Sequence, residues 1–468
     1  MILPAILDPF ADRAAPAVMT RLALDWILQG DTIDPLLDEV AHRQYSREFL
    51  LAHFVEVLAD VACGFRPSVR SAFLRRQLQD VASIRAFYAK LARMEPAVPE
   101  AVVRTTAERA RRLIEAAGGL RDEPVPGYSA RIIDGNVLTG TDHRIAATRR
   151  TRSATLPGMS LAIYEPASGI VGDVILEENA HDQQRSLFGR ISIGVGQLWI
   201  MDRNFCVRSL LDRIAWSGSY FLARWHASAL PFEELGPPAD AGRGEGGAIL
   251  EQPIRAAGSP EQAGLMRLRR IVLRLDEPTR AGESEIVLVT NLPDDVSAQV
   301  CCGAYRDRWR IERHFQRLTD LLHCEVPTLG YPRAALFAFC MSVVAGNALA
   351  ILLGSLRAAH GEELADELSE HALVGEAAEV YPGMMVAAAP SVWPATSGVA
   401  ATELAGLLSE LAARVPVHRM LRSPRGPKRK RPPATSGRRI HHMATKKLLE
   451  QAGGLSPPAK ARPRRTTS

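Results

Sequence analysis

The chain has 468 residues, of which 47% are hydrophobic and 23% are charged. These values are ordinary for a globular protein, exclude a chain too polar to fold, and leave room for about two or three domains with a sizeable core. The net charge of +5 is unevenly spread, because sixteen Lys and Arg but only one acid, Glu450, lie between Arg414 and the end. That segment carries about +15 and the rest of the chain about −10, which points to a polyanionic partner, with a disordered solubilising tail as the alternative.

Residues 1–118 are predicted to form a helical N-terminal domain. Apolar residues recur at spacings of three and four in the segments Arg13–Leu28, Ser46–Cys63, Pro67–Leu78 and Ser83–Ala92. The last two segments are rich in basic residues and are joined by a short turn. They could form a DNA-binding helix-turn-helix, and a helical bundle with a solvated basic face fits them equally well.

Two aspartates are predicted to end strands in the segment 128–225. Short apolar runs there predict strands at 130–134, 159–165, 169–176, 197–201 and 220–224, and helices at 181–191 and 207–217. The first of these strands runs into Asp134-Gly135, a turn signal, and the fourth runs into Asp202. Taken singly, each aspartate is more readily explained as a turn residue at the end of a strand.

Residues 226–292 are predicted to be rich in β-structure. Glycine, proline and acidic residues between Pro231 and Gly247 predict a loop. Strands are predicted at Ile249–Ile254, Met266–Leu275 and Glu285–Asn291. In the second of these, Arg267 and Arg269 share one face, which could lie against DNA or simply face solvent.

The segment 305–319 reads Tyr-Arg-Asp-Arg-Trp-Arg-Ile-Glu-Arg-His-Phe-Gln-Arg-Leu-Thr and is the most informative part of the chain. A helix that begins near Ser297 would align one polar stripe made of Tyr305, Arg308, Glu312, Gln316 and Thr319. An apolar stripe would lie beside it, made of Val300, Ala304, Ile311, Phe315, Leu318 and Leu322. By itself this pattern also fits a solvated helix face with an Arg–Glu pair four residues apart.

The rest of the chain predicts helices and then a flexible basic tail. Ala334–Leu353 is apolar apart from Ser342 and Asn347; it is long enough to cross a membrane, although a buried core helix has the same pattern. Residues 356–415 are predicted to be helical, at Glu362–Glu379 and Glu403–Arg414, and 416–468 to form the tail. The six cysteines form no C-x-x-C pair, which fits a reducing cytoplasm and gives no sign of structural zinc.

Asp134, Asp202 and Glu312 together are the candidate metal ligands. Three carboxylates can hold two divalent cations, and oxygen ligands suit Mg²⁺ or Mn²⁺. Such a pair of ions can activate the attacking oxygen of a phosphodiester reaction and stabilise the leaving oxygen. If the predicted register is wrong, Asp173 is the best substitute, since it lies in a strand beside apolar residues.

These residues resemble the DDE transposases of bacterial insertion sequences, specifically the IS-four family with its Tyr-(2)-Arg-(3)-Glu-(6)-Lys signature. Tyr305, Arg308 and Glu312 match the first three positions, and Thr319 stands where the family has lysine. The blocks Ile-Asp-Gly at 133–135, Met-Asp-Arg-Asn-Phe at 201–205 and Leu-Val-Thr-Asn-Leu at 288–292 are also similar. So is the basic run 425–431.

The resemblance implies an α/β protein with an RNase H-like catalytic core at 128–225 and 293–355 and a β-rich insertion at 226–292. It implies a transposase that excises and inserts its element by metal-dependent phosphodiester hydrolysis and strand transfer at inverted repeats. Asp134, Asp202 and Glu312 would be catalytic and would bind metal. The DNA-binding residues would be Tyr305, Arg308, Trp309, Gln316 and Thr319, although Trp309 could equally pack in the interior and Thr319 supplies no positive charge.

The expected partner is double-stranded DNA, namely the inverted repeats of the element and the target, bound by a homodimer. We expect no membrane association, and a location in the bacterial cytoplasm at the nucleoid. Two alternatives stay open: an inactive or domesticated DNA-binding derivative, which the loss of the signature lysine favours, and a metal-dependent nuclease without strand transfer.

Overall fold

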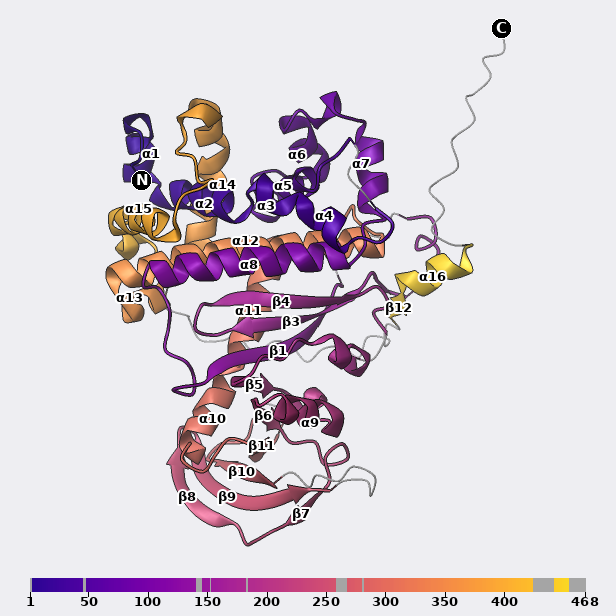
Figure 1. Cartoon of the computed structure of the whole chain (residues 1–468), viewed down its shortest axis with the longest axis vertical. Coiled ribbons are helices and arrows are strands. Elements are labelled where there is room, and N and C mark those ends of the chain that lie inside the picture. The colour runs from indigo at the N-terminus through magenta and orange to yellow at the C-terminus, as the bar shows by residue number, and fades with distance from the viewer. Residues whose placement is uncertain are drawn as a thin grey trace.

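A mixed sheet of ten strands runs through the molecule in the computed structural model, which describes residues 2–44, 48–139, 145–151, 153–181, 184–257, 267–279, 282–423 and 442–453 (Figure 1). The strands lie in the order β4-β3-β1-β5-β6-β11-β10-β9-β7, and β8 pairs with β9. Their bounds are β1 Ser129–Val137, β3 Met159–Glu165, β4 Ile170–Glu177, β5 Gln197–Met201, β6 Tyr220–Arg224, β7 Phe232–Glu234, β8 Ala239–Gly244, β9 Gly247–Ala256, β10 Arg267–Leu275 and β11 Glu285–Thr290. The protein is therefore of the mixed α/β class.

The pairing directions divide the sheet into three parts. Strands β4, β3 and β1 form an antiparallel meander, and β1, β5 and β6 are parallel to one another. The remaining strands are antiparallel, beginning with β11 against β6. The segment 226–292 therefore extends the same sheet.

Strand β1 is longer than the sequence predicts. The expected turn at Asp134-Gly135 is wrong, since both residues pair with β3, at Ala162 and Leu161, and the strand continues to Val137. Pairing with a neighbouring strand overrides the local preference of Asp-Gly for a turn. Asp202, by contrast, directly follows β5 as predicted.

The predicted loop at 231–247 is also wrong, because β7 and β8 form there and pair with β9. The three strands expected in this segment are present as β9, β10 and β11, although Met266 lies outside the described residues. Arg269 is not available to DNA, because it is buried and bonded to Glu251 at 2.5 Å and to the carbonyl of Pro293. Arg267 is exposed.

Helices cover one face of the sheet and form a second layer above it (Figure 1). Helices α8 and α12 run side by side over the sheet, α8 packing on β4, and the N-terminal and C-terminal helices pack on α2 and α12. The bounds are α1 Asp8–Arg13, α2 Ala15–Ile27, α3 Gly30–Ile33, α4 Pro35–Val40, α5 Leu51–Ala62, α6 Val69–Arg75, α7 Ile84–Leu91, α8 Ala97–Ala116, α9 Arg208–Trp216, α10 Ala298–Asp307, α11 Trp309–Asp320, α12 Pro332–His360, α13 Glu362–Glu367, α14 Glu370–Ala387, α15 Ala401–Arg414 and α16 Thr445–Gln451. One hydrophobic core joins most of these helices to the sheet face below them. Helix α9 packs instead in a second hydrophobic cluster, with Trp199 and Phe221 of the opposite sheet face.

Most predicted helices are present with shifted ends, and one is not. The helix expected at 181–191 is replaced by a 3-10 segment at Gln184–Arg190, while residues 182–183 lie outside the description. The N-cap of α7 is Ser83, whose hydroxyl accepts a hydrogen bond from the amide of Ala86. The limits predicted for the helical N-terminal domain, the catalytic core, the insertion, the C-terminal helices and the tail remain predictions.

Helix α12 is long and apolar enough to cross a membrane, yet 94% of its most apolar stretch is buried inside the protein. Its polar side chains are satisfied there. Asn347 accepts a hydrogen bond from the amide of Val171 on the edge strand β4 and donates one to its carbonyl, at 2.9 and 3.0 Å. A core helix that holds the sheet edge explains the apolar run, because a buried amide needs such partners.

The basic tail falls mainly outside the described residues. Of the predicted tail, only 416–423 and 442–453 are described. Within these, β12 (Met443–Ala444) pairs in parallel with β2 (Thr155–Leu156), and α16 follows. The basic run 425–431 lies outside the description.

Candidate active site

The predicted signature helix is two helices that meet at Arg308. Helix α10 ends at Asp307 and α11 begins at Trp309, while Arg308 keeps a right-handed helical backbone (φ −52°, ψ −31°). Two hydrogen bonds of the 3-10 type, between residues three apart, span the junction. The amide of Arg308 donates to the carbonyl of Tyr305, and the amide of Ile311 donates to the carbonyl of Arg308. The stripe is thus interrupted at the arginine that points into the site.

Arg308 bridges two of the three candidate carboxylates. Its guanidinium donates to Glu312 at 2.5 Å, one turn along α11, and to Asp134 on β1 at 3.4 Å. The side chain of Arg308 is only 10% exposed. The Arg–Glu pair is therefore not part of a fully solvated helix face, because the Arg308 guanidinium is buried where it contacts Asp134 of the sheet.

Asp202 lies on the neighbouring strand end. Its carboxylate accepts hydrogen bonds from the amide of Asn204, at 2.8 Å, and so begins a short 3-10 turn at Arg203–Phe205. Strands β1 and β5 pair in parallel with Ile133 beside Met201, which sets Asp134 and Asp202 next to each other in the register. The structure thus places Asp134 near both Asp202 and Glu312, which come from distant parts of the sequence.

The charges at this place act on one another. Burial is the main cause that raises the pKa of Asp134 to about 6, and the carboxylates of Asp202 and Glu312 raise it further. Arg308 and the amide of Gly135 act in the opposite direction. A buried carboxyl group whose negative charge is not fully balanced by a neighbouring arginine is typical of a site that binds an additional cation.

The three carboxylates are chemically suitable ligands for a divalent metal ion, but their side chains are not arranged around a common point as metal ligands would be. Three carboxylates supply the oxygen ligands that Mg²⁺ and Mn²⁺ prefer. Within the part of the chain that the structure describes, however, no three His, Cys, Asp or Glu side chains are grouped closely enough to hold a metal ion. The guanidinium of Arg308 stands between Asp134 and Glu312, so a metal ion would have to replace it.

Two aromatic residues flank Arg308 in opposite environments. Tyr305 is 9% exposed, and the Arg308 guanidinium lies 5.9 Å from the centre of its ring. Burial raises the pKa of Tyr305, so the phenol stays a hydrogen-bond donor at neutral pH. Trp309 is 61% exposed, which rules out the interior packing considered for it and leaves its ring accessible.

The end of the stripe carries no positive charge. Gln316 and Thr319 are both exposed. The hydroxyl of Thr319 donates to the carbonyl of Phe315 at 3.1 Å and lies 3.7 Å from the sulfur of Cys324. Thr319 therefore bonds within its own helix and does not replace the signature lysine.

Asp173, the substitute ligand, lies elsewhere. It is on β4, two strands from β1, and accepts a hydrogen bond from Arg104 of α8 at 2.6 Å. Its role is to join α8 to the sheet edge.

Sequence reasoning missed a second group of charges beside Asp202. The carboxylate of Glu283 binds Arg203 at 3.0 Å and Arg224 at 2.6 Å. These two hydrogen bonds are the main cause that lowers the pKa of Glu283. Arg224 ends β6, where Ala223 pairs with Met201, so it lies next to Asp202 in the register. In the sequence, only the position of Arg203 directly after Asp202 indicates that charged residues could lie beside this aspartate.

His314 was also missed, because it stands at a buried position of α11 where apolar residues were expected. It is 1% exposed, and neither ring nitrogen has a hydrogen-bond partner. The ring packs 5.5 Å from that of Tyr164 and against Gly346 of α12, where an added Cβ would come within 3.2 Å of it. Burial lowers the pKa of His314 well below its usual value.

His314 is expected to make the fold sensitive to acid. Below about pH 6.5 the unfolded chain binds a proton on this ring and the folded chain does not, so the stability of the fold falls as pH falls, by up to about 1.4 kcal/mol per pH unit. In His314→Leu this contribution should vanish. Urea unfolding at pH 7.5 and 5.0 measures it; His371→Gln, an exposed control, should behave as wild type. An unchanged pH dependence in His314→Leu would contradict the assignment.

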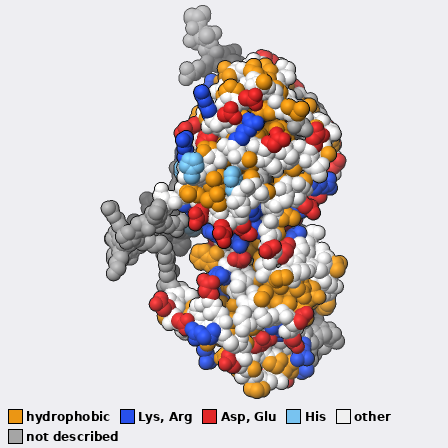
Figure 2. Space-filling view, turned by 90° about the vertical axis from the view of Figure 1, so that its left-hand side faces the viewer, with side chains coloured by type: hydrophobic (Ala, Val, Ile, Leu, Met, Phe, Trp, Pro, Cys, Tyr) orange, Lys and Arg blue, Asp and Glu red, His pale blue; other side chains and the backbone are white. Residues whose placement is uncertain are grey.

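Charges of both signs alternate over the surface shown in Figure 2. Acidic and basic side chains gather there at the waist between the helical part and the strand-rich part. This face has no extended patch of a single sign, so it does not carry the strong positive charge that the tail has in the sequence.

No protein-family model matches the chain. Among curated proteins, it is similar to the putative transposase InsL of insertion sequence element IS186A and to the transposase of insertion sequence element IS421, both from Escherichia coli. Each is 24% identical over 207 residues, which cover 37% of this chain and 54% of the relative. The match thus spans about half the length of these relatives.

Among solved structures, the chain is similar to a piggyBac transposase in a synaptic complex with hairpin DNA, with 9% identity and a TM-score of 0.40 over 85% of each chain. A TM-score this low supports no statement about the site. The similarity in sequence therefore stands as the finding: over part of its length, the chain is similar to these transposases of insertion sequence elements.

Proposed function

We propose that the chain is a DNA transposase of the DDE type that acts on the ends of an insertion sequence. The observation that carries the proposal is the contact of Arg308 with both Asp134 and Glu312, beside Asp202. The similarity to insertion-sequence transposases supports it. So does the sheet order β4-β3-β1-β5-β6, with a meander followed by parallel strands, which is that of an RNase H-like core.

In the proposed reaction Asp134, Asp202 and Glu312 would hold Mg²⁺ or Mn²⁺. Bound there, the metal would supply an activated attacking oxygen and a stabilised leaving oxygen. The attacking groups are water for nicking and then a DNA 3′-hydroxyl for strand transfer. The side chains around the metal bind the DNA: Arg308 donates paired hydrogen bonds to a backbone phosphate, Tyr305 adds one, and Trp309 stacks on an unpaired base. Gln316 and Thr319 would contribute neutral hydrogen bonds only.

The proposed partner is double-stranded DNA, bound by two copies of the chain so that both ends of the element are held together. The proposed location is the bacterial cytoplasm at the nucleoid. The cysteines, which are all free, fit a reducing compartment. The basic tail would add affinity that depends on salt and not on base sequence.

Incubating the full chain with Mg²⁺, a duplex that carries the inverted repeats flanking its gene, and a target plasmid tests the proposal. We expect strand breaks at the repeat ends and joined donor–target products, both visible on a denaturing gel. Breaks without joined products would identify a nuclease. Binding without breaks would identify a non-catalytic derivative, the candidate that Thr319 and the bridging position of Arg308 favour.

Glu283→Gln is expected to tighten the binding of an end-containing duplex by about threefold to tenfold at low salt. The substitution frees Arg203 and Arg224 for phosphate, and each exposed ion pair is worth about 0.5–1 kcal/mol. Fluorescence anisotropy measures the affinity. The control is Glu285→Gln, two residues further along the chain, which removes an exposed partner of Arg274. Equal affinities of Glu283→Gln and wild type would show that the pair does not face DNA.

A further inference from the structure

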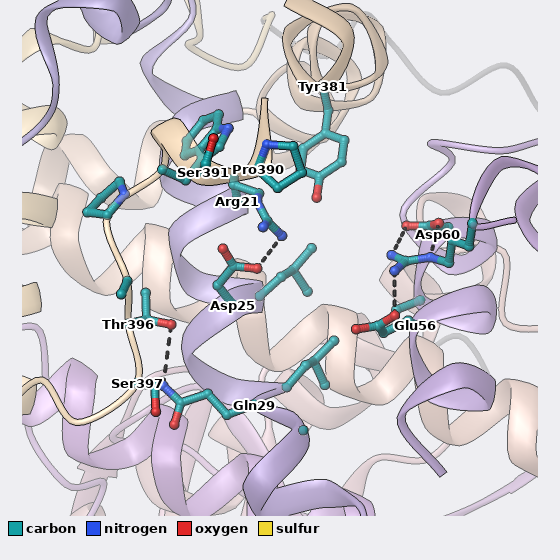
Figure 3. Close-up of a pocket in the computed structure, with 18 residues that line it drawn as sticks. Arg21, Asp25, Gln29, Glu56, Asp60, Tyr381, Pro390, Ser391, Thr396 and Ser397 are labelled. Atoms are coloured by element: carbon teal, nitrogen blue, oxygen red, sulfur yellow. Dashed lines mark hydrogen bonds and ion pairs between the residues drawn. The ribbon is translucent and has the colours of Figure 1, made fainter. Parts of the chain in front are cut away.

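A cavity of about 550 Å³ lies in the helical layer, away from the candidate active site. It is lined by α2, by α5, by α14 and by the segment 390–397, as the close-up in Figure 3 shows. Arg21 and Asp25 form an ion pair on the α2 side. On the facing side Arg76 bonds to Asp60 at 2.8 Å and to Glu56 at 2.5 Å.

The cavity has an excess of negative charge. Its lining contains three carboxylates but two guanidinium groups, and both arginines already bind carboxylates. Burial is the main cause that raises the pKa of Asp25 to about 6, and Glu56 raises it further from across the cavity. A positive charge placed between Asp25 and Glu56 would relieve this repulsion.

The cavity also has hydrogen-bond donors without acceptors. Trp393 is 7% exposed, lines the cavity, and its indole nitrogen has no partner; the same holds for the Nε of Arg21. The guanidinium of Arg21 lies 5.8 Å from the centre of the Trp393 ring, so the two donors are close together. In Figure 3 the hydroxyl of Tyr381 points into the same space. Buried donors of this kind normally have acceptors.

We propose that this cavity binds a small organic cation, one that carries an ammonium or guanidinium group together with an acceptor oxygen. The cationic group lies between Asp25 and Glu56, and the acceptor oxygen receives hydrogen bonds from Trp393 Nε1 and Arg21 Nε. Bound there, the molecule joins α2 and α5 to α14 and the 390–397 segment. The proposal does not depend on the DNA chemistry of the other site.

Isothermal titration of the full chain with L-arginine, agmatine and pentanoate tests the proposal. L-Arginine has both features, agmatine lacks the acceptor carboxylate, and pentanoate lacks the cation. We expect saturable binding of L-arginine, weaker binding of agmatine and none of pentanoate. Absence of saturable binding for both cations, or binding of pentanoate as tight as that of L-arginine, would overturn the proposal.

Variants locate the binding. Asp25→Asn should weaken L-arginine binding by about tenfold or more, because it removes one of the two carboxylates that face the cation. Trp393→Phe keeps an aromatic ring but removes the indole N–H donor, so it should weaken L-arginine binding more than agmatine binding. Glu39→Gln, an exposed carboxylate on α4 outside the cavity, is the control. Thermal melting of each variant without ligand checks the fold, and unchanged affinity in a folded Asp25→Asn protein would place the binding elsewhere.

Discussion

Glu312→Gln is expected to lower the rate of Mg²⁺-dependent cleavage at an element end by at least about 1,000-fold, equivalent to about 4 kcal/mol of barrier. The amide is nearly isosteric but cannot supply the charge that a metal ligand needs. The substitution also removes one carboxylate from Arg308, which keeps its contact with Asp134. DNA affinity should therefore stay within about threefold of wild type or rise slightly. Single-turnover cleavage and anisotropy measure the two effects.

The matched control for Glu312→Gln is Asp320→Asn. Asp320 is on the same helix α11, is exposed, and is far along the helix from Arg308. It should cleave at the wild-type rate. Cleavage by Glu312→Gln at the wild-type rate would show that this glutamate is not a metal ligand, and the assignment of the site would be wrong.

Asp134→Asn is expected to stabilise the metal-free fold at pH 8 by roughly 1–3 kcal/mol while abolishing cleavage. The folded pKa of Asp134, about 6, lies above its ordinary value of 3.8. The carboxyl therefore stabilises the fold when protonated, at low pH, and this contribution is lost as pH rises through about 6. A difference of about two pKa units corresponds to roughly 3 kcal/mol, which is the upper limit of the gain.

Urea unfolding in EDTA at pH 8 and pH 5 tests this expectation. The advantage of Asp134→Asn should shrink at pH 5, where the wild-type carboxyl is largely protonated in the folded protein. Adding Mg²⁺ at pH 8 should reverse the order, because a metal bound only by the folded wild type adds stability. A variant less stable than wild type in EDTA at pH 8 would mean that Asp134 is stabilised by Arg308 more than it is destabilised by burial.

Most strands and helices could be predicted from the sequence, because they depend on the local periodicity of apolar residues. The run 197–201 ends at Asp202 as predicted because an apolar strand followed by a polar turn is a local signal. The turn expected at Asp134-Gly135 is absent because β1 is extended by pairing with β3, where the partners Ala162 and Leu161 lie 28 and 26 residues further along the chain. The strands β7 and β8 were missed for the same reason: their Gly-rich and acidic sequences are extended only because β9 pairs with them.

For the candidate site, the sequence suggested the residue types but not the contacts between them. Spacing on a helix predicts that Arg308 and Glu312 meet, and they do. No local pattern predicts that Arg308 also reaches Asp134, which lies 174 positions earlier. Glu283, which binds Arg203 and Arg224, belongs to this class of contact too. Long-range ion pairs follow from the register of the sheet, which single-sequence patterns do not give.

The bridging position of Arg308 makes DNA binding and metal binding thermodynamically coupled in the proposed enzyme. In the free protein its guanidinium acts as a built-in counterion for Asp134 and Glu312, so a metal ion must compete with it. A DNA phosphate that draws Arg308 away removes this competitor and raises the affinity for metal. Because such coupling is reciprocal, metal must raise the affinity for DNA by the same factor. The protein would then load its metal fully only on DNA, and free copies of the chain would remain inactive at the same concentration of magnesium.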